Sequence, residues 1–291
     1  MRAFARFFLS STRRSASMPK QLGTVSAVVP PGNRTVVRDT ATDRLGINLD
    51  FSRISSSSTT HPHVLFSPMH YEPGYAYPLF VWLHGNGTNE CQLTRLMPLL
   101  SMRNYVAVAT QGIAVTVPAP RGTAEELDSL DVMDMINSGM RSRVQYDWPQ
   151  NEEAVSVAEQ RVFDCISVAR QKNNIAEDRI FLAGFGNGGT MALRLGLLYP
   201  ESFAGVVSIG GSFPSGHLPF RQWNAVRNLP VLLAVGEKST FFSPADACGA
   251  LELFHAAGLP TVIREYPCGQ EIAPAMRQDV NRWIMEQVCG E

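Results

Sequence analysis

The sequence predicts an α/β fold built on a doubly wound, mainly parallel sheet. From residue 79 onward, short apolar segments typical of strands alternate with segments of helical periodicity, an order that produces parallel strands covered by helices on both faces. The segment 79–83 is apolar throughout, as expected for a strand buried on both faces. With 45% hydrophobic and 18% charged residues, the chain of 291 residues carries enough apolar material for such a core.

Short apolar runs bounded by turn residues indicate the strands, and apolar positions that recur every three or four residues indicate the helices. The longest helical pattern covers 151–173, and Gly258 ends the pattern at 245–257 as a typical C-terminal glycine. The expected strands are 63–66, 79–83, 105–110, 179–183, 203–209, 231–235 and 261–266, and the expected helices are 91–102, 151–173, 190–199, 245–257 and 273–288.

Two segments lie outside this alternation. Residues 1–60 are basic and Ser-rich, since the first 38 residues contain seven Lys or Arg and no Asp or Glu, and a Ser/Thr run covers 55–60. We expect this extension to be disordered, with the folded domain at 61–291. Its opening is similar to an organelle transit peptide, although translation from Met18 would leave it unused. Residues 111–150 form a connection long enough for a lid, so a lid-like insertion is expected there.

Composition narrows the function classes. The net charge of −1 offers no basic face for nucleic acid, and no apolar run is long enough to span a bilayer. The five cysteines are widely spaced and form no CxxC pair, which indicates reduced thiols in a cytoplasmic protein rather than disulfides or a zinc site. The histidines lack a carboxylate-rich partner motif, so we expect neither a metal nor a cofactor.

A glycine-rich turn follows the expected strand at 179–183 and allows two interpretations. Gly184, Gly186 and Gly189 match the G-x-G-x-x-G pattern that cradles a dinucleotide pyrophosphate. That pattern also requires an acidic residue about 20 positions later, and the next expected strand runs instead into the segment GGSFP. The same turn matches the nucleophile elbow G-x-S-x-G, except that Gly186 stands in place of the serine.

Several further segments favour the elbow when taken together. They are LFVWLHGNG at 79–87, YDW at 146–148, RIFLAGFGNGGT at 179–190, YPESFAGVVSIG at 199–210, Gly236 after the strand at 231–235, and YPCGQEI at 266–272 through to Trp283. With them the sequence resembles, from about residue 64 to 290, the α/β-hydrolase superfamily within its phospholipase/carboxylesterase and polyhydroxybutyrate-depolymerase-like esterases. The resemblance implies a sheet of α/β-hydrolase type and a Ser–acid–His triad in that chain order.

The resemblance implies that the triad positions fall at Gly186, Ser239 and Gln270. Gly186 has no hydroxyl with which to form an acyl-enzyme, and Ser239 brings no charge to stabilise an imidazolium. Gln270 takes up no proton near neutral pH, so it is no general base. Loss of one triad member typically costs about 10⁴–10⁶ in turnover. We therefore expect a catalytically inactive esterase homologue that retains a ligand pocket or an interaction surface.

The resemblance also places an oxyanion-type loop at 84–87, whose backbone amides survive changes of side chain. One donor of such a site comes from this loop and the other from the amide that follows the nucleophile position. Gly85, Asn86, Gly87 and Asn187 are accordingly expected to bind a small anionic or carbonyl ligand.

Two alternatives to an inactive homologue remain open. The first is an active carboxylic-ester hydrolase with a relocated nucleophile, for which Cys268 paired with His84 or His217 is the clearest candidate. The second is a dinucleotide-binding protein that uses the glycines of the turn after 179–183.

Overall fold

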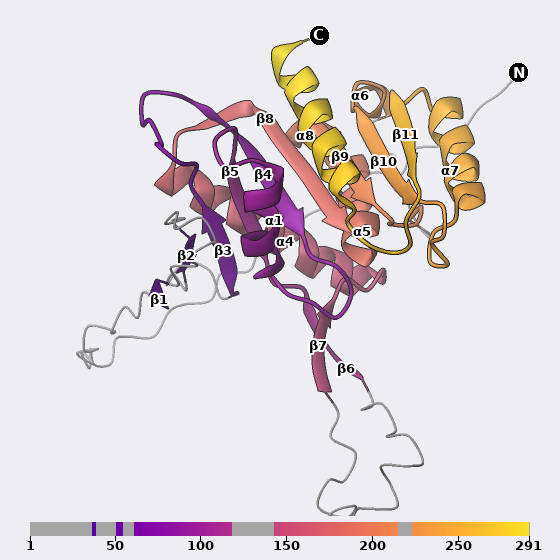
Figure 1. Cartoon of the computed structure of the whole chain (residues 1–291), viewed down its shortest axis with the longest axis horizontal. Coiled ribbons are helices and arrows are strands. Elements are labelled where there is room, and N and C mark those ends of the chain that lie inside the picture. Colours follow the sequence, from indigo (N-terminus) through magenta and orange to yellow (C-terminus); the bar gives the residue numbers. More distant parts are fainter. Residues whose placement is uncertain (1–36, 39–50, 55–60, 118–142, 215–222, 291) are drawn as a thin grey trace, which may run out of the picture. The chain divides into compact units, whose positions relative to one another are not determined.

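The computed structural model describes residues 37–38, 51–54, 61–117, 143–214 and 223–290 (Figure 1). All of them belong to the structural unit Thr35–Glu291, whereas the other unit, Met1–Arg34, lies outside the described residues. Within the described ranges no helix is both long and apolar enough to cross a lipid bilayer.

A nine-stranded sheet carries the fold, in the order β1-β2-β3-β5-β4-β8-β9-β10-β11. From β5 to β11 in that order, each strand runs parallel to the next, whereas the pairs β1–β2, β2–β3 and β3–β5 are antiparallel. The predicted mainly parallel sheet is therefore confirmed. The strands are β1 (Val37–Arg38), β2 (Phe51–Ile54), β3 (His63–Phe66), β4 (Tyr77–Leu83), β5 (Val106–Thr110), β8 (Ile175–Phe185), β9 (Gly205–Ile209), β10 (Val231–Gly236) and β11 (Thr261–Tyr266).

Regular structure begins earlier than the sequence analysis expects. Within 1–60 the structure describes two short strands: β2 pairs antiparallel with β3 from Phe51 opposite Phe66 to Ile54 opposite His63, and β1 pairs with β2. The remainder of the predicted extension lies outside the described residues. Backbone pairing explains these strands, because β3 would otherwise present an open edge of the sheet. Neither strand is long enough to show a periodicity of its own.

Side-chain caps define where two of the helices begin. Asn151 precedes α4 and accepts a hydrogen bond from the Ala154 N–H at 2.8 Å. Ser243 and Asp246 form a capping box at the start of α7. Gly258, at φ 78°, follows the end of α7 as predicted. The helices are α1 (Gln92–Leu100), α4 (Glu152–Lys172), α5 (Asn187–Leu198), α6 (Trp223–Val226), α7 (Pro244–Ala256) and α8 (Pro274–Cys289), with a 3₁₀ turn at Pro200–Ser202.

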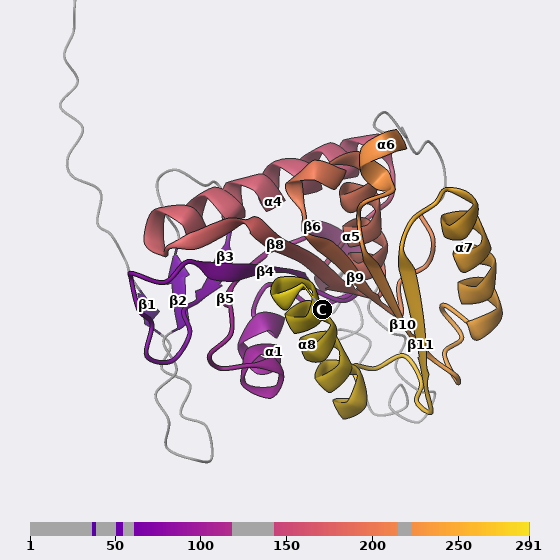
Figure 2. The same cartoon turned by 90° about the horizontal axis from the view of Figure 1, so that it is seen from above.

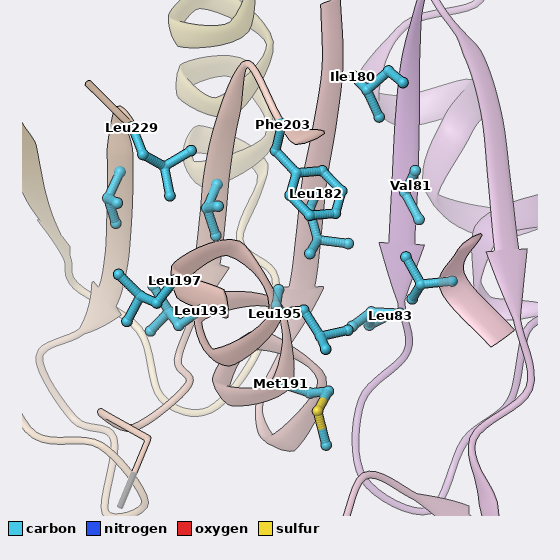
Figure 3. Packing of buried hydrophobic residues seen from close by; sticks show 14 of the residues in the cluster. Val81, Leu83, Ile180, Leu182, Met191, Leu193, Leu195, Leu197, Phe203 and Leu229 are labelled. Carbon is cyan, nitrogen blue, oxygen red and sulfur yellow. The ribbon is translucent and has the colours of Figure 1, made fainter. Parts of the chain in front are cut away.

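Helices cover both faces of the sheet (Figure 2). On one face α4, α5 and α7 share a core with strand residues that include Val81 and Leu182. Figure 3 shows the α5 part of this core. On the other face α1 and α8 share a core with Phe80 and Trp82. Successive residues of β4 thus enter opposite cores, which confirms a strand buried on both faces. The layers leave the carboxyl ends of the parallel strands at one edge of the sheet, where the turns after β4, β8, β10 and β11 meet.

The connection at 111–150 contains a hairpin that the sequence analysis did not predict. β6 (Ile113–Val117) and β7 (Arg143–Asp147) pair antiparallel from Ile113 opposite Asp147 to Val117 opposite Arg143. Its middle, 118–142, lies outside the described residues, so the lid stays a prediction. There the Gly87 N–H donates to the Tyr146 carbonyl at 3.0 Å, and the hairpin is joined to the turn after β4.

Candidate functional site

The turn between β8 and α5 needs glycine at several positions. Gly186 has φ 55° and ψ −125°, a conformation that side chains disfavour, and its N–H donates to the Ile209 carbonyl at 2.9 Å. A Cβ at Gly184 would lie 2.3 Å from the Gly188 carbonyl oxygen, and one at Gly188 would lie 2.4 Å from the Leu83 carbonyl oxygen. The turn is thus held tightly between β4 and β8, and Gly186 stands at its tip.

Gly186, Ser239 and Gln270 lie together at this edge of the sheet. The Ser239 hydroxyl donates to Gln270 Oε1 at 2.6 Å, and Gln270 Nε2 donates to the Gly210 carbonyl at 3.0 Å. A Cβ at Gly186 would lie 3.7 Å from Gln270 Nε2. Ser239 is buried and also accepts a hydrogen bond from the Phe242 N–H at 3.2 Å. The three turns that carry these residues therefore converge on one point.

The chemistry available at that point is hydrogen bonding without a charge. Ser239 and Gln270 satisfy each other, and neither titrates near neutral pH, so the pair neither takes up nor releases a proton. Gly186 presents no nucleophile beside them. These three residues can hold the three turns in register, and they offer no group that attacks a carbonyl.

The Asn86 side chain fills the space beside Gly186. Asn86 Oδ1 accepts a hydrogen bond from the Asn187 N–H at 2.8 Å, and a Cβ at Gly186 would come within 2.5 Å of the same oxygen. The amide of Asn187, which the sequence analysis assigns to a bound ligand, is thus occupied by a side chain of the loop at 84–87. Of the other predicted ligand residues, Gly85 donates its N–H to Gln92 Oε1 at 3.0 Å and Gly87 has φ 69°.

Asp147 is a site residue that the sequence analysis did not single out. Its two carboxylate oxygens each accept from Asn187 Nδ2 at 3.0 Å, and Oδ1 also accepts from the Trp148 N–H at 2.8 Å. Asp147 therefore places negative charge next to the turn where an anion is expected. The YDW segment at 146–148 was the available signal, but nothing in its sequence says that it reaches the turn after β8.

His84 is a structural residue and forms no pair with Cys268. The Gly112 N–H donates to His84 Nε2 at 2.8 Å, which leaves the ring proton on Nδ1, 2.9 Å from the Gly85 carbonyl. Burial lowers the pKa of His84, so the buried ring stays neutral. Both ring nitrogens are occupied, which removes this histidine as a base for a relocated nucleophile.

Cys268 also lacks the environment of an activated thiol. Burial raises its pKa, and the carboxylates of Glu271 and Glu237 raise it further. His217, the other predicted partner, lies outside the described residues. In the ranges that the structure describes, no group of three His, Cys, Asp or Glu side chains is arranged to hold a metal ion.

Comparison with known sequences decides the family. A sequence model of the family described as phospholipase/carboxylesterase matches residues 76–284. This chain belongs to the phospholipase/carboxylesterase family. The matched range runs from β4 into α8 and includes every turn of the site. Membership in the phospholipase/carboxylesterase family favours the elbow interpretation of the turn after β8 over dinucleotide binding.

Two curated relatives of this phospholipase/carboxylesterase family member match parts of the chain. The esterase-related protein NocK of Nocardia uniformis subsp. tsuyamanensis is 27% identical over 160 residues, which are 55% of this chain and 39% of NocK. A SOBER1-like protein of Arabidopsis thaliana, named as a carboxylesterase, is 26% identical over 123 residues, 39% of this chain and 44% of that protein. The chain thus spans less than half the length of these relatives.

Solved structures agree on the fold. The carboxylesterase of Bacillus cereus is 17% identical, with a TM-score of 0.57 over 79% of this chain and 96% of that one. Arabidopsis thaliana SOBER1 is 18% identical, with a TM-score of 0.53 over 73% of this chain and 100% of that one. At these identities the likeness concerns the fold alone, and it confirms the predicted α/β-hydrolase type.

Proposed function

We propose that this chain is a non-catalytic member of the phospholipase/carboxylesterase family, in which Gly186, Ser239 and Gln270 stand at the three triad positions. The observation that carries the proposal is the hydrogen bond from Ser239 to Gln270 Oε1 beside a glycine at the elbow. In a working triad the acid accepts from the histidine and the histidine from the nucleophile. Here Ser239 and Gln270 keep the contact between acid and histidine positions as a neutral hydrogen bond. The nucleophile that such a pair would activate is absent, because position 186 is a glycine.

The Asn187 N–H is also not free to act as an oxyanion donor. In acyl transfer, backbone N–H groups at such a turn stabilise the developing negative charge, and loss of one donor costs about 10²–10³ in turnover. The Asn187 N–H already donates to Asn86 Oδ1, and the Asp147 carboxylate is hydrogen-bonded to the same residue's side chain. A carbonyl or anionic ligand at Asn187 therefore competes with Asn86 and binds only when that side chain turns away.

The cysteines are in keeping with a cytoplasmic location. All five are free thiols, and Cys165 is buried, with its pKa raised to about 12 by burial. In the proposed role, the turn after β8 has a structural function in place of a catalytic one. Any ligand or partner would bind at another part of the surface.

An activity and labelling experiment tests the proposal. The full chain is assayed with p-nitrophenyl butyrate and treated with a fluorophosphonate probe. We expect neither turnover above the buffer rate nor labelling. Robust hydrolysis would overturn the proposal, and so would labelling that a single Ser or Cys substitution abolishes, because either result requires a nucleophile elsewhere.

Stepwise rebuilding of the triad makes the test sharper. Gly186→Ser alone should remain inactive, because no base lies beside it and Asn86 Oδ1 occupies the space of its Cβ. Gly186→Ser with Ser239→Asp and Gln270→His restores the three groups, and adding Asn86→Ala should raise the activity of that triple variant by removing the side-chain oxygen that the new Cβ would meet at 2.5 Å. Activity in the single Gly186→Ser variant would show that the base has been assigned to the wrong residue.

A further inference from the structure

A surface cavity of about 340 Å³ lies between the start of α1 and the loop that leads into α8. Gln92 belongs to its wall and joins it to the turn after β4, because Gln92 Oε1 accepts from the Gly85 N–H at 3.0 Å and from Trp82 Nε1 at 2.9 Å. The cavity is thus next to the candidate site, although none of its lining residues is Gly186, Ser239 or Gln270.

The lining of this cavity is positively charged. It contains Arg95 and Arg277 and no Asp or Glu. Arg95 is exposed and forms no ion pair within the part of the chain that the structure describes. Arg277 Nη1 donates to the Ile272 carbonyl at 2.6 Å, which orients the guanidinium group and leaves its other N–H groups for a ligand. Two guanidinium groups at one cavity favour a carboxylate or a phosphate.

The start of α8 adds to this preference. α8 has neither a side-chain cap nor an acidic residue in its first turn, so its own residues do not neutralise the positive end of its dipole. The start of α1 adds less, because the Gln92 and Leu93 N–H groups already donate to the Asn89 and Glu90 carbonyls.

Apolar side chains border the charged part. Leu96, Leu99 and Ile272 line the cavity, and Leu99 is 60% exposed. A second hollow of about 600 Å³ shares Leu99 and continues along α1 and α8, where Met285 lies among polar side chains that include Arg282 and Glu286. The two helices lie side by side under the sheet (Figure 2). The apolar border of the two arginines is therefore formed by the first cavity's own Leu96, Leu99 and Ile272.

We propose that this cavity binds an anionic amphiphile, with a carboxylate or phosphate head between Arg95 and Arg277 and an alkyl chain along Leu96 and Leu99. A small inorganic anion would leave Leu99 uncovered, and a neutral lipid would leave both guanidinium groups without a partner. The inference goes beyond the proposed function, because binding at this cavity does not depend on whether the triad positions are inactive.

Calorimetric titration of the full chain tests the site with four probes. Octanoate and octyl phosphate should both bind, and comparison of the two tells which head group the site prefers. Octanol, which lacks the charge, and acetate, which lacks the chain, should bind at least about tenfold more weakly, the ratio expected from one lost charge-assisted contact or several buried methylenes. Equal binding of octanol and octanoate, or no binding of either anion with an eight-carbon chain, would overturn the proposal.

Substitutions place the binding at this cavity. Arg95→Gln should weaken octanoate binding about tenfold, while Arg103→Gln, a matched change of an exposed arginine outside the cavity, should leave it unchanged. Leu99→Ala should weaken it as well, and Leu253→Ala, at an equally exposed leucine on α7, should not. Unaltered binding in Arg95→Gln contradicts the assignment. Ester turnover by the unmodified chain would overturn the proposed function and leave this binding result standing.

Discussion

Asn86 Oδ1 accepts the backbone N–H of Asn187 at 2.8 Å, although the two residues are 101 positions apart in the chain. The contact depends on Gly186, because a Cβ there would come within 2.5 Å of the Asn86 oxygen. The absence of a side chain at position 186 and the closure of the neighbouring amide are therefore a single structural arrangement. This arrangement directs the Asn187 N–H at the protein itself.

The first prediction concerns this contact. Asn86→Ala should raise the hydrogen–deuterium exchange rate of the Asn187 amide severalfold, since a hydrogen bond of this kind contributes about 0.5–1.5 kcal/mol. Residue-resolved NMR measures the rate. Lys238→Ala, an exposed side chain at the same edge of the sheet, is the control and should leave the rate as it is. An unchanged rate in Asn86→Ala would show that the Asn187 amide is protected by something else.

The second prediction concerns Ser239. Ser239→Ala should lower the free energy of unfolding by about 1–3 kcal/mol, because it leaves the Phe242 N–H and Gln270 Oε1 without their partner at a buried position. Urea titration measures the change. Ser156→Ala, on the exposed face of α4, should change the stability by less than about 0.5 kcal/mol. Equal effects of the two substitutions would contradict a structural role for Ser239.

The third prediction compares two glycines. Gly188→Ala should destabilise the fold by about 3 kcal/mol, because its Cβ would lie 2.4 Å from the backbone oxygens of Leu83 and His84, which have little freedom to move. Gly249→Ala should stabilise it by about 0.5–1 kcal/mol, since Gly249 is exposed within α7 and has open space around its Cα. Thermal unfolding of both variants measures the difference. A tolerated Gly188→Ala would mean that α5 can shift away from β4.

The fourth prediction concerns the pH dependence of stability. Burial lowers the pKa of His84 below its ordinary 6.5 and outweighs the opposite effect of Glu90 and Asp147. As the pH falls through about 6.5, His84 therefore becomes protonated in the unfolded chain while it stays neutral in the folded chain. The contribution of neutral His84 to stability is complete above that pH and is lost progressively as the pH falls towards the folded pKa.

Urea unfolding at several pH values between 7.5 and 5 measures this contribution. His84→Gln should flatten the decline in the free energy of unfolding on the acid side, relative to the unmodified chain. His255→Gln, at an exposed histidine of α7, should keep the original slope. Should His84→Gln and the unmodified chain show the same slope, the proton uptake would have to be assigned to other groups, His63 first, whose pKa burial also lowers.

Periodicity predicted most of the strands and helices, and it was wrong where partners far along the chain decide the outcome. The prediction started the helix at residue 190, whereas α5 starts at Asn187, because Gly188 and Gly189 pack into the fold at distances that only glycine permits. β8 begins at Ile175 rather than 179 because Ile175 pairs with Tyr77. The hairpin of β6 and β7 was missed for the same reason, since pairing and not composition defines it.

Local pattern alone determined the buried parallel strands, the helices between them and the residues just after each strand, because apolar periodicity and turn chemistry act over only a few neighbouring positions. Tertiary structure decided which contacts those residues make. Asn86 accepts from the Asn187 N–H, Asp147 accepts from the Asn187 side chain, and Arg95 and Arg277 line one cavity. Each of these joins segments that are distant in the chain. Only the path of the folded backbone sets such distances, and no window of sequence contains them.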